Sequence, residues 1–206
     1  MQLVLVRHAL PERVDGAAGG VADPRLTALG QQQAHRVVDA VGGGVQALYS
    51  SPMARARATA APLAAATGVE PVVVDDLREY DAESPHYVPV HEMPVVDPAG
   101  WQRIVDGLLP EGVDVAGFTA RVAAALEGIV AAHPGRGAVV VVAHAGVINC
   151  WLAHLLGIDR PLAFPLDYTG ISRVLATRDG RRLVRTVNEI AHVSDLLGPT
   201  AGTSAG

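Results

Sequence analysis

The hydrophobic pattern of the chain contains two short apolar runs that each end at a histidine. Residues 1–6 are rich in β-branched and leucine side chains and have no helical period, which is typical of a buried strand. Arg7 and His8 follow directly. Residues 138–143 form a second such run, and His144 follows it. Because open α/β sheets bind ligands at the carboxyl ends of their strands, these polar residues are candidates for a functional site.

The remaining pattern alternates between strand-like runs and helix-like stripes. Further strands are predicted at residues 47–50, 71–74, 172–176 and 183–187. Helices are predicted at residues 27–41, 53–67, 98–108, 117–132 and 147–156. Asp179 and Gly180, between the last two strands, are a strong hairpin signal. Strands that alternate with helices indicate an α/β protein, and the absence of an obvious linker indicates one domain.

Capping residues mark the start of two of these helices. Thr27 is the predicted N-cap of the first, and Ser51 that of the second, with Pro52 at its first position. Arg55 and Arg57 lie in the first turns of the second helix, where cations oppose the helix dipole at a small cost that solvated arginines tolerate. Alternatively, Arg55 reaches over the sheet to an anion. Both arginines cannot easily face one site, because their positions on the helix point in different directions.

The segment before the long helix at residues 117–132 lacks a regular pattern. Prolines recur through it, so residues 84–116 are expected to form an irregular insertion with one short helix, lying over the site. The small and polar residues 198–206 are expected to be a flexible tail. Residues 1–197 then form the single domain, and a chain of 206 residues that is 50% hydrophobic can bury a sizeable core.

The net charge and the lengths of the apolar stretches limit which partners and which cellular location are expected. The net charge is −5 and all 16 basic residues are arginine. Because they form no basic stripe, nucleic acid is not an expected partner. No stretch is expected to be long enough to span a membrane and no signal peptide is visible, so the sequence predicts a cytoplasmic protein without a membrane partner. A homodimer is among the expected assemblies.

Cysteine and histidine usage indicates no metal chemistry. Cys150 is the single cysteine, which excludes an internal disulfide, and its place in an apolar helix predicts a buried thiol. The 8 histidines show no HExxH or other ligand spacing. We therefore expect neither a metal ion nor another cofactor.

Two histidines, two arginines and a carboxylate near strand ends suit phosphoryl transfer. Guanidinium groups bind phosphate with paired hydrogen bonds and stay charged at any working pH. A neutral imidazole can attack phosphorus and carry it as phosphohistidine, while a second imidazole helps to balance the phosphoryl charge. A carboxylic acid can protonate the leaving alkoxide. This scheme requires no metal.

These residues stand in a series of motifs that resembles the histidine phosphatase superfamily, the phosphoglycerate-mutase-like proteins. The motifs are Leu5-Val6-Arg7-His8, residues 23–34 with Leu26-Thr27 and Gln33-Ala34, residues 50–60 with Arg55, Leu77-Arg78-Glu79, residues 141–148 around His144, and residues 188–192. They follow the family order over nearly the whole chain. Each motif is weak alone, but the ordered series is highly specific.

The resemblance implies a fold and a reaction. The fold would be a three-layer α/β/α sandwich around a mostly parallel central sheet, with a helical and irregular insertion. The activity would be that of a phosphomonoester hydrolase acting on a small phosphorylated substrate through a phosphohistidine. His8 would be the catalytic nucleophile and Glu79 the proton donor, with Asp81 and Glu83 as alternatives for the acid.

The resemblance also implies a phosphate pocket. Arg7, Arg55 and His144 would bind the phosphoryl group together with the backbone N–H of Ala145, and His144 would take part in catalysis. The chain departs from the family pattern at Ala9, where glycine is usual, and in the apolar residues that follow. These departures leave the reacting groups in place and affect the part of the site that recognises the substrate.

Three alternative functions follow from the same residues. The nearest is a cofactor-dependent phosphoglycerate-type mutase, which must retain its product and phosphorylate it again. The modest insertion and the small-residue tail favour hydrolysis. A non-catalytic phospholigand-binding domain would not need a nucleophile and an acid. A nucleotide-binding doubly wound domain is disfavoured because the chain contains neither a GxGxxG motif nor a lysine for a P-loop.

Overall fold

Residues 1–17 and 20–197, the part of the chain that this computed structural model describes, fold around a six-stranded sheet. The strand order is β3-β2-β4-β1-β5-β6. The strands are β1 (Gln2–Arg7), β2 (Val45–Ser50), β3 (Pro71–Val73), β4 (Ala138–Ala143), β5 (Ile171–Ala176) and β6 (Arg182–Glu189). Each predicted strand is thus confirmed, with small shifts at its ends. The predicted tail, residues 198–206, lies outside the described residues.

Four neighbouring strands of the sheet run in parallel. β2 pairs with both β3 and β4, and β4 pairs with β1. β5 is antiparallel to β1, and β6 is antiparallel to β5. The hairpin predicted from Asp179 and Gly180 therefore forms one edge of a mostly parallel sheet, as expected. The carboxyl ends of β1, β2 and β4 meet at one end of the sheet, where they can position polar side chains together.

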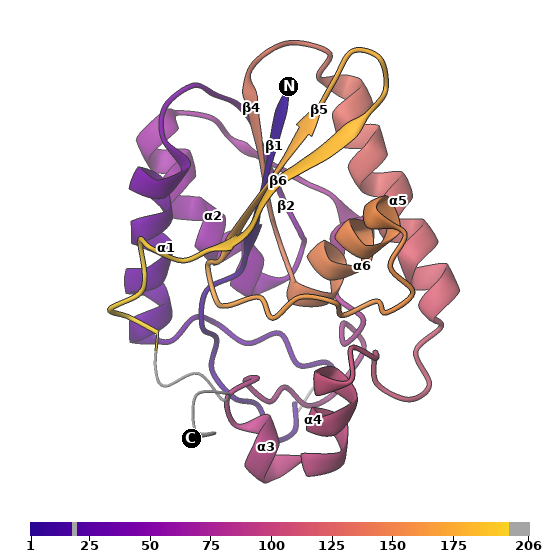
Figure 1. Cartoon of the computed structure of the whole chain (residues 1–206). Coiled ribbons are helices and arrows are strands. Elements are labelled where there is room, and N and C mark those ends of the chain that lie inside the picture. Colours follow the sequence, from indigo (N-terminus) through magenta and orange to yellow (C-terminus); the bar gives the residue numbers. More distant parts are fainter. Residues whose placement is uncertain (18–19, 198–206) are drawn as a thin grey trace.

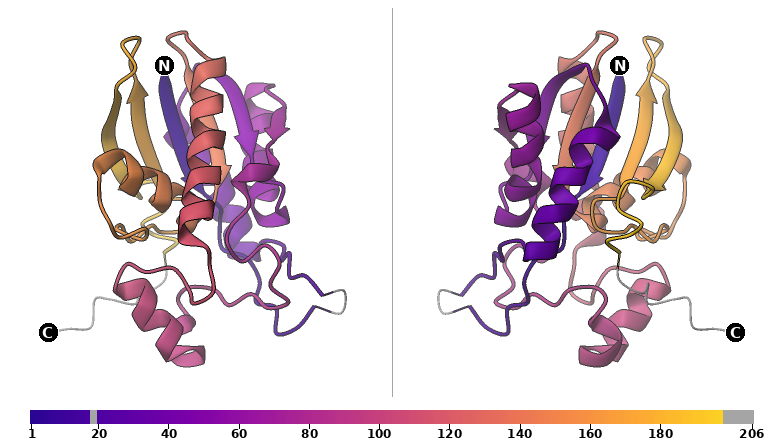
Figure 2. Two further views of the ribbon diagram at one scale, coloured as in Figure 1. Left: turned by 90° about the vertical axis from the view of Figure 1, so that its right-hand side faces the viewer. Right: turned by 90° about the vertical axis from the view of Figure 1, so that its left-hand side faces the viewer.

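Helices cover both faces of the sheet and confirm the three-layer sandwich (Figures 1 and 2). α1 (Ala28–Val41) and α2 (Ala54–Thr67) pack on one face. α5 (Val115–Ala132) and α6 (Ala145–Leu156) pack on the other. Parallel sheets are usually buried on both sides, which explains why their strands read as unbroken apolar runs.

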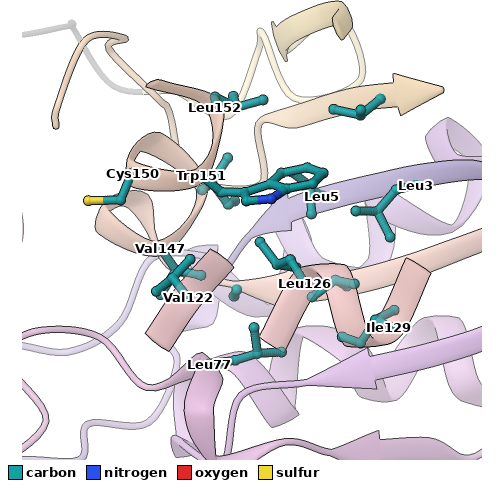
Figure 3. Packing of buried hydrophobic residues seen from close by; sticks show 14 of the residues in the cluster. Leu3, Leu5, Leu77, Val122, Leu126, Ile129, Val147, Cys150, Trp151 and Leu152 are labelled. Atoms are coloured by element: carbon teal, nitrogen blue, oxygen red, sulfur yellow. The ribbon is translucent and has the colours of Figure 1, made fainter. Parts of the chain in front are cut away.

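Side chains of β1 alternate between two cores. Leu3 and Leu5 belong to the cluster beneath α5 and α6, whereas Val4 and Val6 belong to the cluster beneath α1 and α2. Figure 3 shows the larger cluster, where Trp151 of α6 lies close to Leu5 and is completely buried. The rigid sheet that results holds the strand ends, and hence Arg7 and His8, in fixed positions.

The segment predicted to be an insertion contains two short helices instead of one. α3 (Met93–Val96) and α4 (Pro98–Val105) follow the short 3₁₀-helix η1 (Asp75–Leu77) in the chain. Asp97 separates α3 from α4, and its side chain accepts a hydrogen bond from Gly100 N at the start of α4. Figure 2 shows this pair beyond the carboxyl ends of the parallel strands. α3 and α4 therefore lie at the end of the sheet that carries His8.

One of the two predicted helix caps is correct. Thr27 accepts a hydrogen bond from Gly30 N and caps α1 as expected. The prediction for Ser51 was wrong: α2 begins at Ala54, and the carboxylate of Asp23 accepts from the Ala54 N–H at 2.9 Å. Ser51 instead lies 2.7 Å from a ring nitrogen of His144, because its position at the end of β2 faces the neighbouring strand β4.

By length and composition alone, α5 could cross a membrane, so the expectation that no segment reaches that length was wrong. A core helix of a globular protein passes the same test. The apolar stripe of α5 lies against the sheet, where Phe118, Val122 and Leu126 are buried. Small side chains dominate its other faces, and this composition raises the mean hydropathy of the helix.

Candidate active site

The pairing of β1 with β4 brings the two histidines together. Arg7, the last residue of β1, is level with Ala143, the last residue of β4, so His8 and His144 leave neighbouring strands side by side. Their ring centroids are 5.1 Å apart, and both side chains are buried. This is the adjacency that the two apolar runs suggested and that the sequence alone could not establish.

The backbone selects the tautomer of His8. Its Nδ1 lies 2.8 Å from the carbonyl oxygen of Ala9. Because a carbonyl oxygen only accepts hydrogen bonds, Nδ1 carries the proton and Nε2 keeps its lone pair. Burial, followed by the positive charges of Arg55 and Arg7, lowers the pKa of His8 well below its usual value. The ring is therefore neutral at neutral pH, with Nε2 available as a nucleophile.

His144 lies where β4 passes into α6. Its Nε2 is 2.7 Å from the hydroxyl oxygen of Ser51, and its Nδ1 is buried without a hydrogen-bond partner among the described residues. Burial and then the charge of Arg55 lower the pKa of His144 well below its usual value. Ala145, the first residue of α6, contributes one of the free N–H groups of the helix start, which favour an anion.

Arg7 and Arg55 reach the site from β1 and α2 and are held by aromatic rings. The guanidinium carbon of Arg7 lies 4.0 Å from the ring centre of Tyr168, and Arg7 Nη1 donates to the carbonyl oxygen of Leu166. The guanidinium carbon of Arg55 lies 4.7 Å from the ring centre of Tyr87. Stacking on aromatic faces offsets part of the cost of burying these cations.

Several N–H groups of these two arginines lack a partner within the described residues. They are Arg7 Nε, Arg55 Nε and Arg55 Nη1. An unpaired buried donor costs about 1–3 kcal/mol, and more when it is charged, so such groups usually serve a ligand. Arg57, two positions along α2, is exposed, which confirms that only one of the two arginines faces the site.

Glu79 is buried beside the start of α6. Its carboxylate accepts hydrogen bonds from the N–H groups of Gly146 at 2.8 Å and Tyr80 at 3.1 Å. Burial, followed by the negative charge of Asp81, raises the pKa of Glu79 to about 7, although the two hydrogen bonds and Arg55 act in the opposite direction. A carboxyl group with such a pKa can both give and take a proton near neutral pH.

The two alternative acids occupy different environments from Glu79. Asp81 forms an ion pair with Arg55, with 2.8 Å between Oδ1 and Nη2. This contact orients the Arg55 guanidinium and places a second negative charge close to Glu79. Glu83 is exposed and pairs with Arg78 at the surface, at 3.4 Å. Of the three carboxyl groups, Glu79 alone is buried.

Sequence reasoning missed two residues that shape this site. Tyr168 packs against both Arg7 and the ring of His8, at 5.7 Å between ring centres for the latter, but it lies in an irregular loop with no periodic signal. Ser51 stands where the sequence pattern predicts a helix cap, and that pattern gives no indication of its contact with His144. Within residues 1–17 and 20–197, no group of three or more histidine, cysteine or acidic residues is placed to hold a metal ion.

Two imidazoles, two guanidinium groups and a protonatable carboxyl group thus converge at the ends of β1 and β4, an arrangement suited to binding and transferring a phosphoryl group. The chain belongs to the histidine phosphatase superfamily (branch 1), whose family model matches residues 3–189.

Curated relatives share close to a third of the aligned residues. The probable phosphoglycerate mutase GpmB of Yersinia enterocolitica is 30% identical over 166 residues, which cover 77% of this chain and 76% of that protein. The PE-PGRS family protein PE_PGRS11 of Mycobacterium tuberculosis is 31% identical over 184 residues. That alignment covers 78% of this chain but spans only 31% of the mycobacterial protein.

Solved structures share the fold at lower identity. A mycobacterial glucosyl-3-phosphoglycerate phosphatase in complex with inorganic phosphate superposes with a TM-score of 0.73 at 24% identity, covering 94% of this chain and 99% of that chain. A phosphoserine phosphatase from Entamoeba histolytica, in complex with phosphoserine, superposes with a TM-score of 0.71 at 23% identity, covering 93% and 98%. These likenesses show the shared three-layer architecture.

Proposed function

We propose that the protein is a phosphomonoester hydrolase that acts through a phosphohistidine on His8. The observation that carries this proposal is the free lone pair of His8 Nε2 in a site with buried, unpartnered N–H groups of Arg7 and Arg55 and an unpartnered ring nitrogen of His144. The unpaired donors match the oxygens of a phosphoryl group, and the lone pair supplies the nucleophile. A domain that only bound phosphate would have no use for this tautomer.

The reaction would proceed in two balanced steps. In the first, Nε2 of His8 forms a bond to phosphorus while the bond to the leaving oxygen breaks, and protonated Glu79 gives its proton to that oxygen. Arg7, Arg55 and His144 stabilise the charge on the three other oxygens, and the Ala145 N–H adds a further donor. In the second step, ionised Glu79 takes a proton from water as the water oxygen attacks phosphorus, and the nitrogen–phosphorus bond breaks.

Small phosphorylated metabolites are the expected substrates. The phosphoserine and glucosyl-3-phosphoglycerate named for the two structural neighbours are both small phosphomonoesters. The curated name of GpmB favours a second candidate, a phosphoglycerate-type mutase. In a mutase, the phosphohistidine would pass its phosphoryl group back to a retained product instead of to water.

A phosphoenzyme experiment tests the hydrolase. Incubation with a small phosphomonoester such as p-nitrophenyl phosphate, followed by rapid denaturation at alkaline pH, should give protein heavier by one phosphoryl group. The adduct should be labile in acid. His8→Ala should abolish the adduct and phosphate release, whereas His35→Ala, at an exposed position of α1, should leave both unchanged.

Three outcomes separate the candidate functions. Phosphate released in proportion to substrate consumed supports the hydrolase. Transfer of labelled phosphate from one phosphoglycerate to another, without release, would establish the mutase instead. Phosphate binding without any adduct in the wild-type protein would leave only the phospholigand-binding function.

A further inference from the structure

We propose that Gln33 is a positioning residue for the nucleophile: it orients the peptide group that keeps the proton of His8 on Nδ1. Gln33 lies on α1 and is almost completely buried. The kinetic part of this proposal rests on the proposed function, whereas its structural part, the tautomer of His8, can be measured without any substrate.

The argument starts from a shared peptide plane. The carbonyl oxygen of Ala9, which accepts from His8 Nδ1 at 2.8 Å, belongs to the same peptide group as the N–H of Leu10. That N–H donates to Oε1 of Gln33 at 3.0 Å. Because a trans peptide group is planar, with its N–H and C=O pointing in opposite directions, holding the N–H end fixes the direction of the carbonyl. Gln33 therefore aims the acceptor at His8.

The NH₂ group of Gln33 permits only one orientation of its side-chain amide. Nε2 of Gln33 donates to the carbonyl oxygen of Leu196 at 3.1 Å. Reversing the amide would place its NH₂ group against the Leu10 N–H and its oxygen against the Leu196 carbonyl, so neither hydrogen bond could form. The carbonyl group of Leu196 thus fixes the amide of Gln33, and Gln33 in turn fixes the peptide group between Ala9 and Leu10.

Neighbouring peptide groups are held in the same way, which leaves this short segment little freedom. The Ala9 N–H donates to the hydroxyl oxygen of Thr59 at 2.9 Å. The carbonyl oxygen of Leu10 accepts from Thr27 N at 3.0 Å. Between these two anchors, the peptide group from Ala9 to Leu10 has Gln33 as its partner on one side and His8 as its partner on the other.

Removing the Gln33 amide should allow the ring of His8 to change its tautomer. Without the amide, the part-buried N–H of Leu10 loses its acceptor, and an N–H group left without a hydrogen bond costs free energy. Rotation of the peptide group toward another acceptor or toward water relieves this cost and turns the Ala9 carbonyl away from His8. The ring can then place its proton on Nε2, the atom that must be unprotonated to attack phosphorus.

The test compares Gln33→Met with Gln32→Met, the same substitution at an exposed position of the same helix. Nitrogen chemical shifts of histidine-labelled protein report which ring nitrogen of His8 carries the proton, and the loss of a signal in His8→Gln assigns it. Gln33→Met should move the proton from Nδ1 toward Nε2. With p-nitrophenyl phosphate, kcat should fall about 10-fold, the lower end of the loss found when a partner that orients a metal-bound histidine is removed. The affinity for inorganic phosphate should stay unchanged, as should every property of Gln32→Met.

Gln33→Glu separates the two hydrogen bonds of the side chain and remains informative if Gln33→Met does not fold. A glutamate oxygen can still accept from the Leu10 N–H, whereas the ionised carboxylate cannot donate to Leu196. We therefore expect this variant to keep the wild-type tautomer. A tautomer shift in Gln33→Glu, or an unshifted tautomer in folded Gln33→Met, would overturn the proposal.

The outcomes also separate this proposal from the proposed function. If wild-type protein forms no phosphohistidine but Gln33→Met still shifts the His8 proton, then Gln33 orients His8 and the hydrolase function is wrong. If the phosphohistidine forms in the wild-type protein and at the same rate in Gln33→Met, the hydrolase stands and the positioning role is wrong.

Discussion

His8 and Glu79 illustrate how burial can push two titratable groups in opposite directions. Loss of water disfavours the charged form of each, so it lowers the pKa of the imidazole and raises the pKa of the carboxyl group to about 7. The neighbouring charges reinforce this difference, because Arg55 and Arg7 disfavour an imidazolium and Asp81 disfavours a second carboxylate. The two shifts together favour a neutral nucleophile beside a protonated acid, which is the combination that the proposed first step needs.

Glu79→Gln tests the acid. It should slow phosphoryl transfer most strongly for substrates whose leaving alcohol has a high pKa, because these depend on proton donation, and much less for p-nitrophenyl phosphate. Single-turnover rates over a series of aryl and alkyl phosphates measure this dependence. Glu83→Gln, at an exposed carboxyl group, is the control and should not change it. Equal slowing for all leaving groups would argue against Glu79 as the donor.

The pH dependence follows from the raised pKa of Glu79. The rate of phosphoenzyme formation with an alkyl phosphate should fall as the pH rises through about 7, because Glu79 then loses the proton that it must give. Asp81→Asn removes a negative charge that raises this pKa, so the fall should move to lower pH. Rapid-quench rates between pH 5 and 9 measure the midpoint. A midpoint that is the same in Asp81→Asn and wild-type protein would contradict this electrostatic coupling.

At the scale of elements, the start of α6 connects two parts of the candidate site. It follows His144 in the chain, and its Gly146 N–H donates to the carboxylate of Glu79. Gly146 permits this contact, since a Cβ atom there would lie 2.4 Å from Glu79 Oε1 and 2.8 Å from the ring of Tyr80. The residue lies in a helix with ordinary backbone angles, so glycine is required for space and not for conformation. The helical pattern of residues 147–156 predicted α6, but only packing reveals why its second residue has no side chain.

Gly146→Ala should therefore displace Glu79 and lower phosphatase activity, although alanine favours helices. Gly128→Ala is the matched control, because Gly128 lies in α5 with nothing within 4 Å of an added Cβ. The control should gain about 0.5–1 kcal/mol of unfolding free energy and keep full activity. Urea titrations and steady-state kinetics of both variants provide the comparison. Full activity in Gly146→Ala would show that the acid does not depend on this contact.

At the scale of the whole molecule, two cores fix the sheet, and the candidate site at one end of it contains arginine N–H groups without a partner among the described residues. Such a site costs free energy until an anion occupies it, so a bound anion should stabilise the entire fold. Arg55 links α2 to the irregular segment that contains Asp81 and Tyr87.

Inorganic phosphate or vanadate should accordingly raise the melting temperature, and the rise should grow with the logarithm of the anion concentration above the dissociation constant. At about 100 times that constant, the gain in unfolding free energy should be about 2.7 kcal/mol. Arg55→Leu should abolish this increase, whereas Arg57→Leu on the exposed side of α2 should preserve it. Differential scanning calorimetry with increasing phosphate measures the effect. An equal increase in Arg55→Leu would place the anion site elsewhere.

The sequence by itself determined the main elements and most residues of the candidate site. Runs and stripes of apolar residues predict strands and helices because burial repeats at the period of each element, and Arg7, His8, Arg55, Glu79 and His144 stand in motifs whose order is specific to one family. Only the tertiary structure decided that β1 and β4 are neighbours, that Ser51 faces His144 and not the start of α2, and that Tyr168 packs on Arg7. These contacts join residues far apart in the chain, so no local period records them. The tautomer of His8 cannot be read from the sequence either, because it depends on the contact between Gln33 of α1 and the backbone of Leu10, which follows β1.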